Sequence, residues 1–501
     1  MFLALVRPLV TPHSTETLIL GAGYAGLAAA ALLAAEGRGV TVLEAHDTLG
    51  GCASFFKTGP YTFDVGATTF SAVRPDRPAG RVFAHLGIEP AFERVDPGMV
   101  IRMPHADVVR HASIDSWIHE AQQHFSGDQP GFWKQLYHLE EQVWSLIDGK
   151  SYIPPVTMRD WMRMVDPRNL VSLPLLPGLV RPVRHLMQQY GVDNDPTFRR
   201  FVDEQLLIST QNNAAGAPYL TGAMGLTYPS ETYYPVGGMV RPAILLLRSI
   251  TQNGGTVKFR RAVTSIERHD RRWRVTCANG DVYDAATVVS SIPIWNMASL
   301  LSGDADQGPA RWFQKHAERF PRVWSALTLY FALDGVPSVA SPYVQLHLDE
   351  PLPWVHSDSL FLTISRPGDT QKAPVGHCTV TVSTHARIDD WQGLSPEEHA
   401  ERKAIMTRAM VAYIKRRMHE FDGMQWIHED AGTPWTWVKY THRHHGFVGG
   451  LPHATRQPLL TLPPNQTPFP GLYHIGDTAF PGQGTPAVML GAWNTVERIL
   501  S

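Results

Sequence analysis

The 501-residue chain contains few cysteines: only Cys52, Cys277 and Cys378 occur. They stand far apart and form no CxxC pair, which argues against a disulfide framework and a cysteine zinc site. No apolar run reaches the roughly 18 residues that span a bilayer. The opening stretch, MFLALVRPLVTPH, is interrupted at Arg7 and Pro8, and no small-residue cleavage site of a secretory signal follows. We therefore expect a cytoplasmic protein.

The chain also lacks an excess of either charge. Lys and Arg number 44 against 46 Asp and Glu, so the net charge is -2 and no field attracts polyanions. This argues against a nucleic-acid partner. The stretch HEAQQH, residues 119–124, resembles the zinc motif HExxH, but its histidines are five residues apart and about 140° apart on a helix. The histidines of THRHHG, 441–446, fit a solvated strand edge, and we predict no metal site.

The length exceeds the roughly 250 to 300 residues of a single core, so more than one folding unit is expected. Residues 14–75, 235–300 and 465–501 share an α/β pattern of short apolar strands and helices. Residues 76–234 are mainly helical in pattern, whereas 301–464 hold strand-like runs and a charged helix. The sequence predicts an α/β fold: a discontinuous Rossmann-like domain from the first three segments, with an inserted α+β substrate domain from the other two.

The most specific local pattern is TLILGAGYAGLAAAALLAAEGRGVTVLEA, residues 17–45, which predicts a strand, a glycine turn, a helix and a second strand. Gly21, Gly23 and Gly26 form GxGxxG. The first glycine makes a tight turn, the second lets the backbone approach a pyrophosphate, and the third lets the helix pack closely on the sheet. Glu44, at the end of the second strand, would accept hydrogen bonds from the adenosine ribose. The pattern predicts a dinucleotide site and disfavours NADP.

Two further glycine motifs favour flavin over nicotinamide. Gly50 and Gly51 follow Glu44 closely, and Gly66 follows a short strand, so the chain can pass close to a second part of the cofactor.

The tail GDTAFPGQGTPAVML, residues 476–490, supplies the other motif. Gly476 and Asp477 follow a strand, and the carboxylate would bind ribitol or ribose hydroxyls. Gly482 and Gly484 leave room for a ring system, and Pro486 suits the first turn of the final helix. The positive end of that helix would stabilise a reduced flavin.

Taken together, the motifs GAGYAGL, LGGCAS, FDVGATTF, YYPVGGM and GDTAFPGQGTPAV resemble those of the FAD-dependent carotenoid desaturase and isomerase family, which is phytoene desaturase-like and lies within the amine oxidase-like flavoprotein superfamily. The resemblance is strongest to the C-3′,4′ desaturases and carotene isomerases. Amine oxidases often carry Arg after the first Gly-Gly pair, where this chain has Cys52, so an amine substrate is disfavoured. The resemblance implies FAD, with the contacts Gly21, Gly23, Gly26, Glu44, Gly50, Gly51, Gly66, Val263, Gly476, Asp477, Gly482, Gln483 and Gly484.

The implied activity is desaturation of a carotenoid or similar polyene by hydride transfer to FAD, with electrons passing to oxygen or a quinone. Three alternatives stay open: a cis-trans isomerase that uses reduced FAD, a flavin amine oxidase, and a flavoprotein that binds a polyene without catalysis.

The substrate side is less specific, and no catalytic acid or base can be named. Residues 168–190 mix Leu and Val with cations, which suits peripheral contact with a membrane surface or a lid over the protein's own core. The stretch DEQLLISTQNN, 203–213, resembles one that borders the substrate in relatives, or it shows only the polarity of a helix surface. Its candidates are Asp203, Glu204, Gln205 and Gln211.

Overall fold

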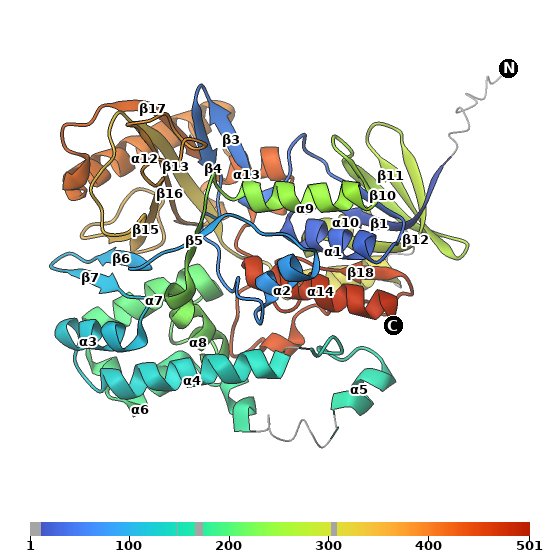
Figure 1. Cartoon of the computed structure of the whole chain (residues 1–501), viewed down its shortest axis with the longest axis horizontal. Coiled ribbons are helices and arrows are strands. Elements are labelled where there is room, and N and C mark those ends of the chain that lie inside the picture. The colour runs from blue at the N-terminus through green and yellow to red at the C-terminus, as the bar shows by residue number, and fades with distance from the viewer. Residues whose placement is uncertain (1–11, 148, 165, 167–173, 302–307) are drawn as a thin grey trace.

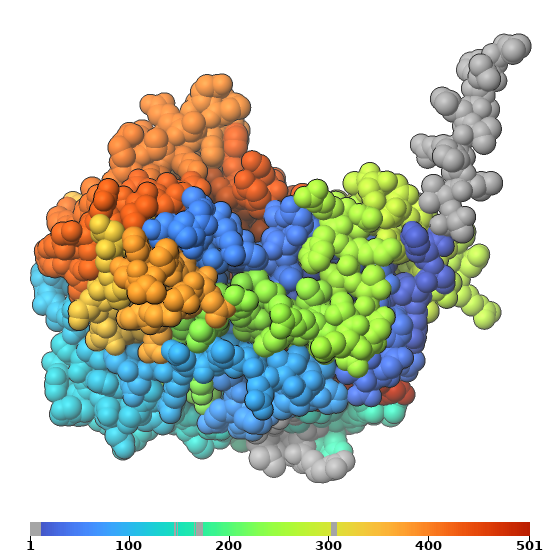
Figure 2. Space-filling model, turned by 45° about the horizontal axis from the view of Figure 1, so that its top comes forward, coloured from blue at the N-terminus to red at the C-terminus, as the bar shows by residue number. Residues whose placement is uncertain are grey.

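The structure is a computed structural model that describes residues 12–147, 149–164, 166, 174–301 and 308–501 (Figure 1). Two seven-stranded sheets organise the chain. Each sheet draws its strands from distant parts of the sequence, as the predicted discontinuous arrangement requires. Figure 2 shows the result on one surface, where early-chain residues in blue lie between green mid-chain and orange late-chain residues.

The first sheet has the Rossmann-like arrangement. Its strand order is β10-β11-β12-β1-β2-β9, and β18 pairs with the second half of β12. The strands β9, β2, β1, β12 and β18 run parallel, whereas β10 and β11 form an antiparallel extension. The bounds are β1 His13–Leu20, β2 Val40–Leu43, β9 Thr256–Lys258, β10 Val263–His269, β11 Arg272–Cys277, β12 Val282–Ser290 and β18 Leu472–His474.

Helices from three parts of the chain cover this sheet: α1 (Tyr24–Ala35) packs against α9 (Val240–Gln252) and α14 (Thr485–Leu500), as Figure 1 shows. Eleven of the twelve residues of α1 are buried, so it needs no polar face and its apolar residues run all round. α2 (Pro78–His85) packs on α14 and joins the same core. The two ends of the chain therefore fold together.

The second sheet is mixed, with the order β17-β13-β16-β15-β14-β6-β7; its pairs are antiparallel except for β14 with β6. Its bounds are β6 Met99–Arg102, β7 Asp107–Arg110, β13 Ser325–Leu333, β14 Tyr343–His347, β15 Ser359–Ile364, β16 Cys378–Ala386 and β17 Trp426–Gly432. The long helix α12 (Pro396–Arg417) packs on one face, and a capping box between Ser395 and Glu398 fixes its start.

A group of helices lies against the other side of this sheet, apart from α5 (Met158–Met164), whose Asp160 pairs with Arg498 of α14 (Figure 1). The bounds of the group are α3 Ile114–His124, α4 Gln129–Ile147, α6 Val183–Gln189, α7 Pro196–Thr210 and α8 Tyr219–Thr227. Trp117, Trp133, Phe198 and Phe201 form their aromatic core, and the buried guanidinium of Arg110 stacks on both tryptophans. In the ranges that the structure describes, no helix combines the length and the apolarity needed to cross a bilayer.

The remaining elements connect the two sheets. They are β3 Phe55–Thr58, β4 Tyr61–Asp64, β5 Phe92–Arg94, β8 Tyr233–Pro235, α10 Ile294–Leu300, α11 Pro309–Ala317 and α13 Pro434–Thr441. The hairpin of β3 and β4 packs on the second sheet, where Phe63 contacts Tyr330. This hairpin, which the sequence analysis assigns to the cofactor domain, thus links the two sheets.

Candidate functional site

A cavity of about 1000 Å³ lies between the two sheets. Its lining combines the glycine motifs of the chain's two ends with α7, β13, β15 and β16 of the substrate side. A cavity of this size can hold a cofactor together with part of a substrate, and its position between two domains is typical of such sites.

The first glycine motif forms one wall. A Cβ on Gly21, whose φ is +96°, would lie 2.4 Å from Ser291 Oγ, and one on Gly26 would lie 2.0 Å from the Gly21 carbonyl. A Cβ on Gly23 would instead meet no described atom within 4 Å. Gly21 therefore makes the turn, Gly26 lets α1 pack closely, and Gly23 presents bare backbone to the cavity.

The second glycine motif lies directly on the first. The Gly50 amide donates to the Ala22 carbonyl at 2.8 Å, and a Cβ on Gly51 would lie 3.4 Å from Gly23 Cα. The Glu44 carboxylate accepts from the Ala22 amide at 2.6 Å and from the His46 amide at 2.9 Å. These bonds hold the acid beside the N-terminus of α1, where the ribose of a dinucleotide is expected. Gly66 and Val263, at the start of β10, also line the cavity.

The C-terminal motif forms the adjoining part of the lining, since Gly21 and Gly476 both lie beside Ser291. Gly476, Asp477, Gln483 and Gly484 line the cavity together with the first turn of α14. Gln483 Nε2 donates to the Ser209 carbonyl at 2.7 Å and so ties this motif to α7. Gly482 and Gly26 lie outside the lining; Gly482 has a packing role, since a Cβ there would lie 2.5 Å from His453 Nε2. The other eleven predicted cofactor residues all face one cavity.

Arg443 is a site residue that the sequence analysis missed. Its side chain is 9% exposed, and Nη2 lies 2.7 Å from Asp477 Oδ2 while Nη1 lies 3.6 Å from Cys52 Sγ. Burial raises the pKa of the Cys52 thiol, although Arg443 opposes that shift. The guanidinium thus joins the loop after the first Gly-Gly pair to the C-terminal motif.

The expectation of a strand edge at THRHHG is wrong. α13 ends at Thr441, His442 adopts a left-handed conformation, and His444–Gly446 forms a 3-10 turn. Pro434 is the first residue of α13, a position that favours proline, so the stretch before the histidines starts a helix. The histidines of HEAQQH lie on α3, where His124 Nε2 contacts Glu120 at 3.2 Å. Among the described residues, no group of His, Cys, Asp or Glu could hold a metal ion.

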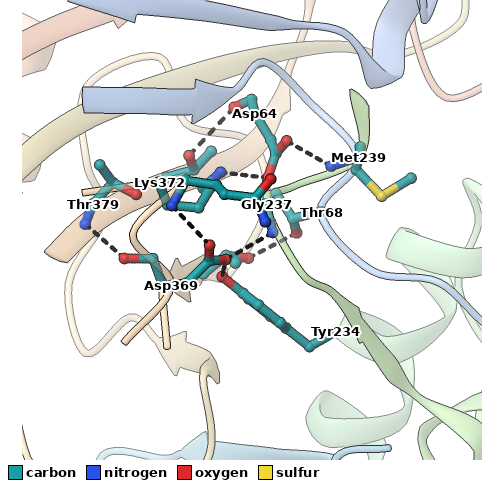
Figure 3. A network of polar contacts seen from close by, with 12 residues as sticks. Asp64, Thr68, Tyr234, Gly237, Met239, Asp369, Lys372 and Thr379 are labelled. Carbon is teal, nitrogen blue, oxygen red and sulfur yellow. Dashed lines mark hydrogen bonds and ion pairs between the residues drawn. The ribbon is translucent and has the colours of Figure 1, made fainter. Parts of the chain in front are cut away.

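Two buried carboxylates join the motifs FDVGATTF and YYPVGGM, as Figure 3 shows. Asp64 accepts from Lys372 Nζ at 2.7 Å and from the Met239 amide at 2.9 Å. Asp369 accepts from the Tyr234 hydroxyl at 2.7 Å and from the Gly237 amide at 2.9 Å. This network fixes residues 64–68 across the seam between the two sheets.

The cavity lining fits a flavin dinucleotide. Ser54 Oγ and Gln211 Oε1 are buried in that lining, and neither has a hydrogen-bond partner within the described ranges. Buried polar atoms of this kind are normally satisfied, so they indicate a ligand. The open space beside Gly23 and the N-termini of α1 and α14 suit a pyrophosphate and an electron-rich ring.

Known proteins resemble the chain in sequence and in fold. The chain is 26% identical to a prolycopene isomerase of Arabidopsis thaliana over 97% of this chain and 82% of that protein. It is 23% identical to a carotenoid 3,4-desaturase of Haloarcula japonica over 97% of this chain and 98% of that protein. A mutant putrescine oxidase superposes with a TM-score of 0.62 at 14% identity, covering 98% of this chain and 99% of that chain. The α/β fold and the family resemblance predicted from sequence are confirmed.

The family match extends over nearly the whole described chain. It covers residues 24–500 and carries the description "Flavin containing amine oxidoreductase". The second glycine motif, at Gly50 and Gly51, and the C-terminal motif fall inside this range, whereas Gly21 and Gly23 directly precede it. The chain belongs to the flavin containing amine oxidoreductase family and is an FAD-dependent enzyme.

Proposed function

We propose that this enzyme desaturates a long apolar polyene of the carotenoid type, with hydride transfer to FAD and electrons then passing to oxygen or a quinone. The cavity carries the proposal, because it joins the glycine motifs to the wall of the second sheet. The names of the carotenoid-acting relatives support a polyene over an amine. We also propose that residues 14–75, 235–300 and 465–501 form the FAD-binding domain and that 76–234 and 301–464 form the substrate domain. Of the thirteen predicted cofactor residues, we propose that the eleven that line the cavity contact FAD and that Gly26 and Gly482 act through packing.

The chain's own residues would bind and orient the cofactor and the substrate. FAD, when bound, supplies the hydride acceptor. Glu44 would hold the ribose, the N-termini of α1 and α14 would offset negative charge, and Arg443 would keep Asp477 in place. Burial between the two sheets would exclude water from the reacting carbon.

Isomerisation is the second candidate, because the four prolycopene isomerases share 25–26% identity with 97% of this chain. One anaerobic experiment separates the two. Holoenzyme is mixed with an acyclic carotene in detergent, the flavin band is followed, and products are resolved by chromatography. Bleaching of the flavin with a red-shifted product supports desaturation, whereas geometric isomers formed only after prior reduction support isomerisation. If neither carotene chemistry nor flavin change occurs, the proposed function is wrong.

We further propose peripheral contact with a membrane through residues 168–190, of which 168–173 lie outside the described residues. Leu176 and Val180 expose 45% and 52% of their surface. A pocket of about 350 Å³ nearby in sequence is lined by Arg181, Arg184 and His185, which suits anionic headgroups. Flotation with anionic vesicles should carry the protein upward, and Leu176→Glu with Val180→Glu should abolish this. Equal flotation of wild type and double variant would contradict the contact.

A further inference from the structure

The second sheet has two faces of different chemistry. On the α12 side, β13 to β16 present mostly apolar side chains, such as Leu329, Leu346, Leu362, Val380 and Val382. On the opposite side, the alternate positions are mostly polar: Thr328, Gln345, Ser359, Thr363, Thr379, Thr381, Ser383 and His385. Such alternation is typical of a sheet with one solvated face. Here, however, the polar face is largely buried, so it must meet polar partners.

One half of the polar face has protein partners. Residues 64–68 cross it: Thr68 Oγ1 pairs with Thr363 Oγ1 at 2.7 Å, and Thr381 Oγ1 donates to the Asp64 carbonyl at 3.3 Å. The Tyr330 hydroxyl donates to the Val65 carbonyl at 2.6 Å. Hydrogen bonds to residues 64–68 therefore satisfy the polar side chains in this half of the face.

The other half faces the cavity. Ser357, Ser359, Ser383 and His385 line it, and Glu204 of α7 lies behind the first two. We call Glu204, Ser357 and Ser359 the serine subsite. Glu204 is 6% exposed, and both serine hydroxyls donate to its Oε2, at 2.7 Å from Ser357 and 2.6 Å from Ser359.

The hydrogen bonds of the subsite determine what it can accept. Ser359 Oγ also accepts from Gln345 Nε2 at 3.1 Å, and Ser357 Oγ accepts from the Ser359 amide at 3.2 Å. Ser357 Oγ also lies 3.1 Å from the Ser359 carbonyl and 3.4 Å from Ser359 Oγ. A hydroxyl has one proton and two lone pairs, so when both protons go to Glu204, at the shortest of these distances, each oxygen keeps one lone pair and no proton. A ligand hydroxyl can donate to this lone pair. A carboxylate has no proton to donate and would face the Glu204 charge.

We propose that the serine subsite binds a hydroxyl group of the substrate, so the preferred polyene is an alcohol rather than a pure hydrocarbon or an acid. This inference rests on the proposed function, since it names the substrate class of the same cavity.

A matched set of ligands tests the inference. All-trans-retinol, its methyl ether and all-trans-retinoate share one polyene chain and differ only in the terminal group. Dissociation constants for the FAD-loaded enzyme are measured in detergent by quenching of tryptophan fluorescence, with an acyclic carotene hydrocarbon measured in parallel. Retinol should bind about tenfold more tightly than its methyl ether, which has no proton to donate, and retinoate should bind more weakly than retinol.

Three variants test whether the preference for retinol arises at the serine subsite. Ser357→Ala with Ser359→Ala should abolish the preference for retinol over the ether and leave the affinity for the ether unchanged. Glu204→Gln should raise the affinity for retinoate relative to retinol by about tenfold. Asp203→Asn is the control, because Asp203 is the next residue on α7 but bonds to the Ala214 amide instead of the serines. FAD content and thermal unfolding show that each variant is folded.

The outcomes separate the two proposals. If the carotene hydrocarbon binds, the serine subsite alone would be overturned by equal binding of retinol and its ether, or by equal effects of Asp203→Asn and the serine variants. Failure of the retinoids and the carotene alike to quench fluorescence would overturn the polyene function itself.

Discussion

Arg443 Nη2 lies 2.7 Å from Asp477 Oδ2; the arginine side chain is buried, and that of Asp477 is 20% exposed. It joins a turn after α13 to the motif at the end of β18 and places a cation within 3.6 Å of the thiol after the first Gly-Gly pair. The two parts of the proposed cofactor site are thus joined by a residue that neither motif contains.

Replacing Arg443 should therefore weaken FAD binding. Arg443→Met leaves the Asp477 carboxylate without its cation, and we expect a loss of tenfold to a hundredfold in affinity, which corresponds to about 1.4 to 3 kcal/mol. Titration of apoprotein with FAD measures this. Arg272→Met is a matched control, because Arg272 lies on the first sheet but bonds backbone carbonyls away from the cavity lining. Equal affinities of Arg443→Met and Arg272→Met would contradict the assigned role.

Two glycines of the first motif should respond differently to the same methyl group. Gly26→Ala places Cβ 2.0 Å from the Gly21 carbonyl, so it should destabilise the fold by about 1 to 3 kcal/mol. Gly23→Ala meets open space at a φ of -73°, so the free energy of unfolding should change by less than about 0.5 kcal/mol. The methyl group of Gly23→Ala should instead weaken FAD binding. Urea unfolding of the apoproteins and FAD titration together test this pair, and a stable Gly26→Ala would refute the packing argument.

The pair of Asp64 and Lys372 should matter for stability far more than a pair at the surface. Both side chains are about 5% exposed and 2.7 Å apart, so Lys372→Met leaves a buried carboxylate without its cation and should cost about 3 to 5 kcal/mol. Lys403→Met breaks the exposed pair with Asp430 and should cost less than about 1 kcal/mol. Denaturant titration of the two variants gives the comparison. Similar losses in both would mean that the network in Figure 3 does not hold the seam.

Buried histidines should make the fold sensitive to acid. Burial, assisted by His316, lowers the pKa of the fully buried His474 to about 3, below its usual 6.5. As the pH falls, His474 is therefore protonated in the unfolded chain before it is protonated in the folded chain. Its contribution to the free energy of unfolding is complete above about pH 6.5 and is lost as the pH drops toward 3. The slope should reach about 1.4 kcal/mol per pH unit for this residue. Urea titrations from pH 7 to 4 measure it.

His474→Asn should flatten that dependence, whereas His419→Gln, at a side chain that is 80% exposed, should leave it unchanged. Parallel curves for wild type and His474→Asn would show that His474 does not contribute to the acid sensitivity.

The parts of the fold that sequence predicted are those with local signals. The βαβ unit around Gly21, Gly23 and Gly26 is contiguous, and each glycine has its own steric reason. The capping box at Ser395 is likewise contained within four residues. The C-terminal motif was identified because a strand, a carboxylate and a helix start follow one another closely.

The rest depends on contacts between distant segments. Arg443 lies in a histidine-rich stretch whose only signal is composition, and its partner Asp477 is 34 residues away. Glu204 and Gln205 are buried although their polarity suggested a helix surface, because α7 packs on a sheet face that is itself polar at Gln345 and Ser359. Hydrophobic periodicity cannot show burial where both surfaces in contact carry hydrogen-bonding groups.

The central claim is that the chain's beginning and end bind one FAD together. The most direct measurement is an experimental density map of the FAD complex. The account predicts continuous density from Glu44, past the bare backbone of Gly23, to the N-terminus of α14 at Gly484. Density for FAD that lies away from either Gly23 or Gly484 would contradict it.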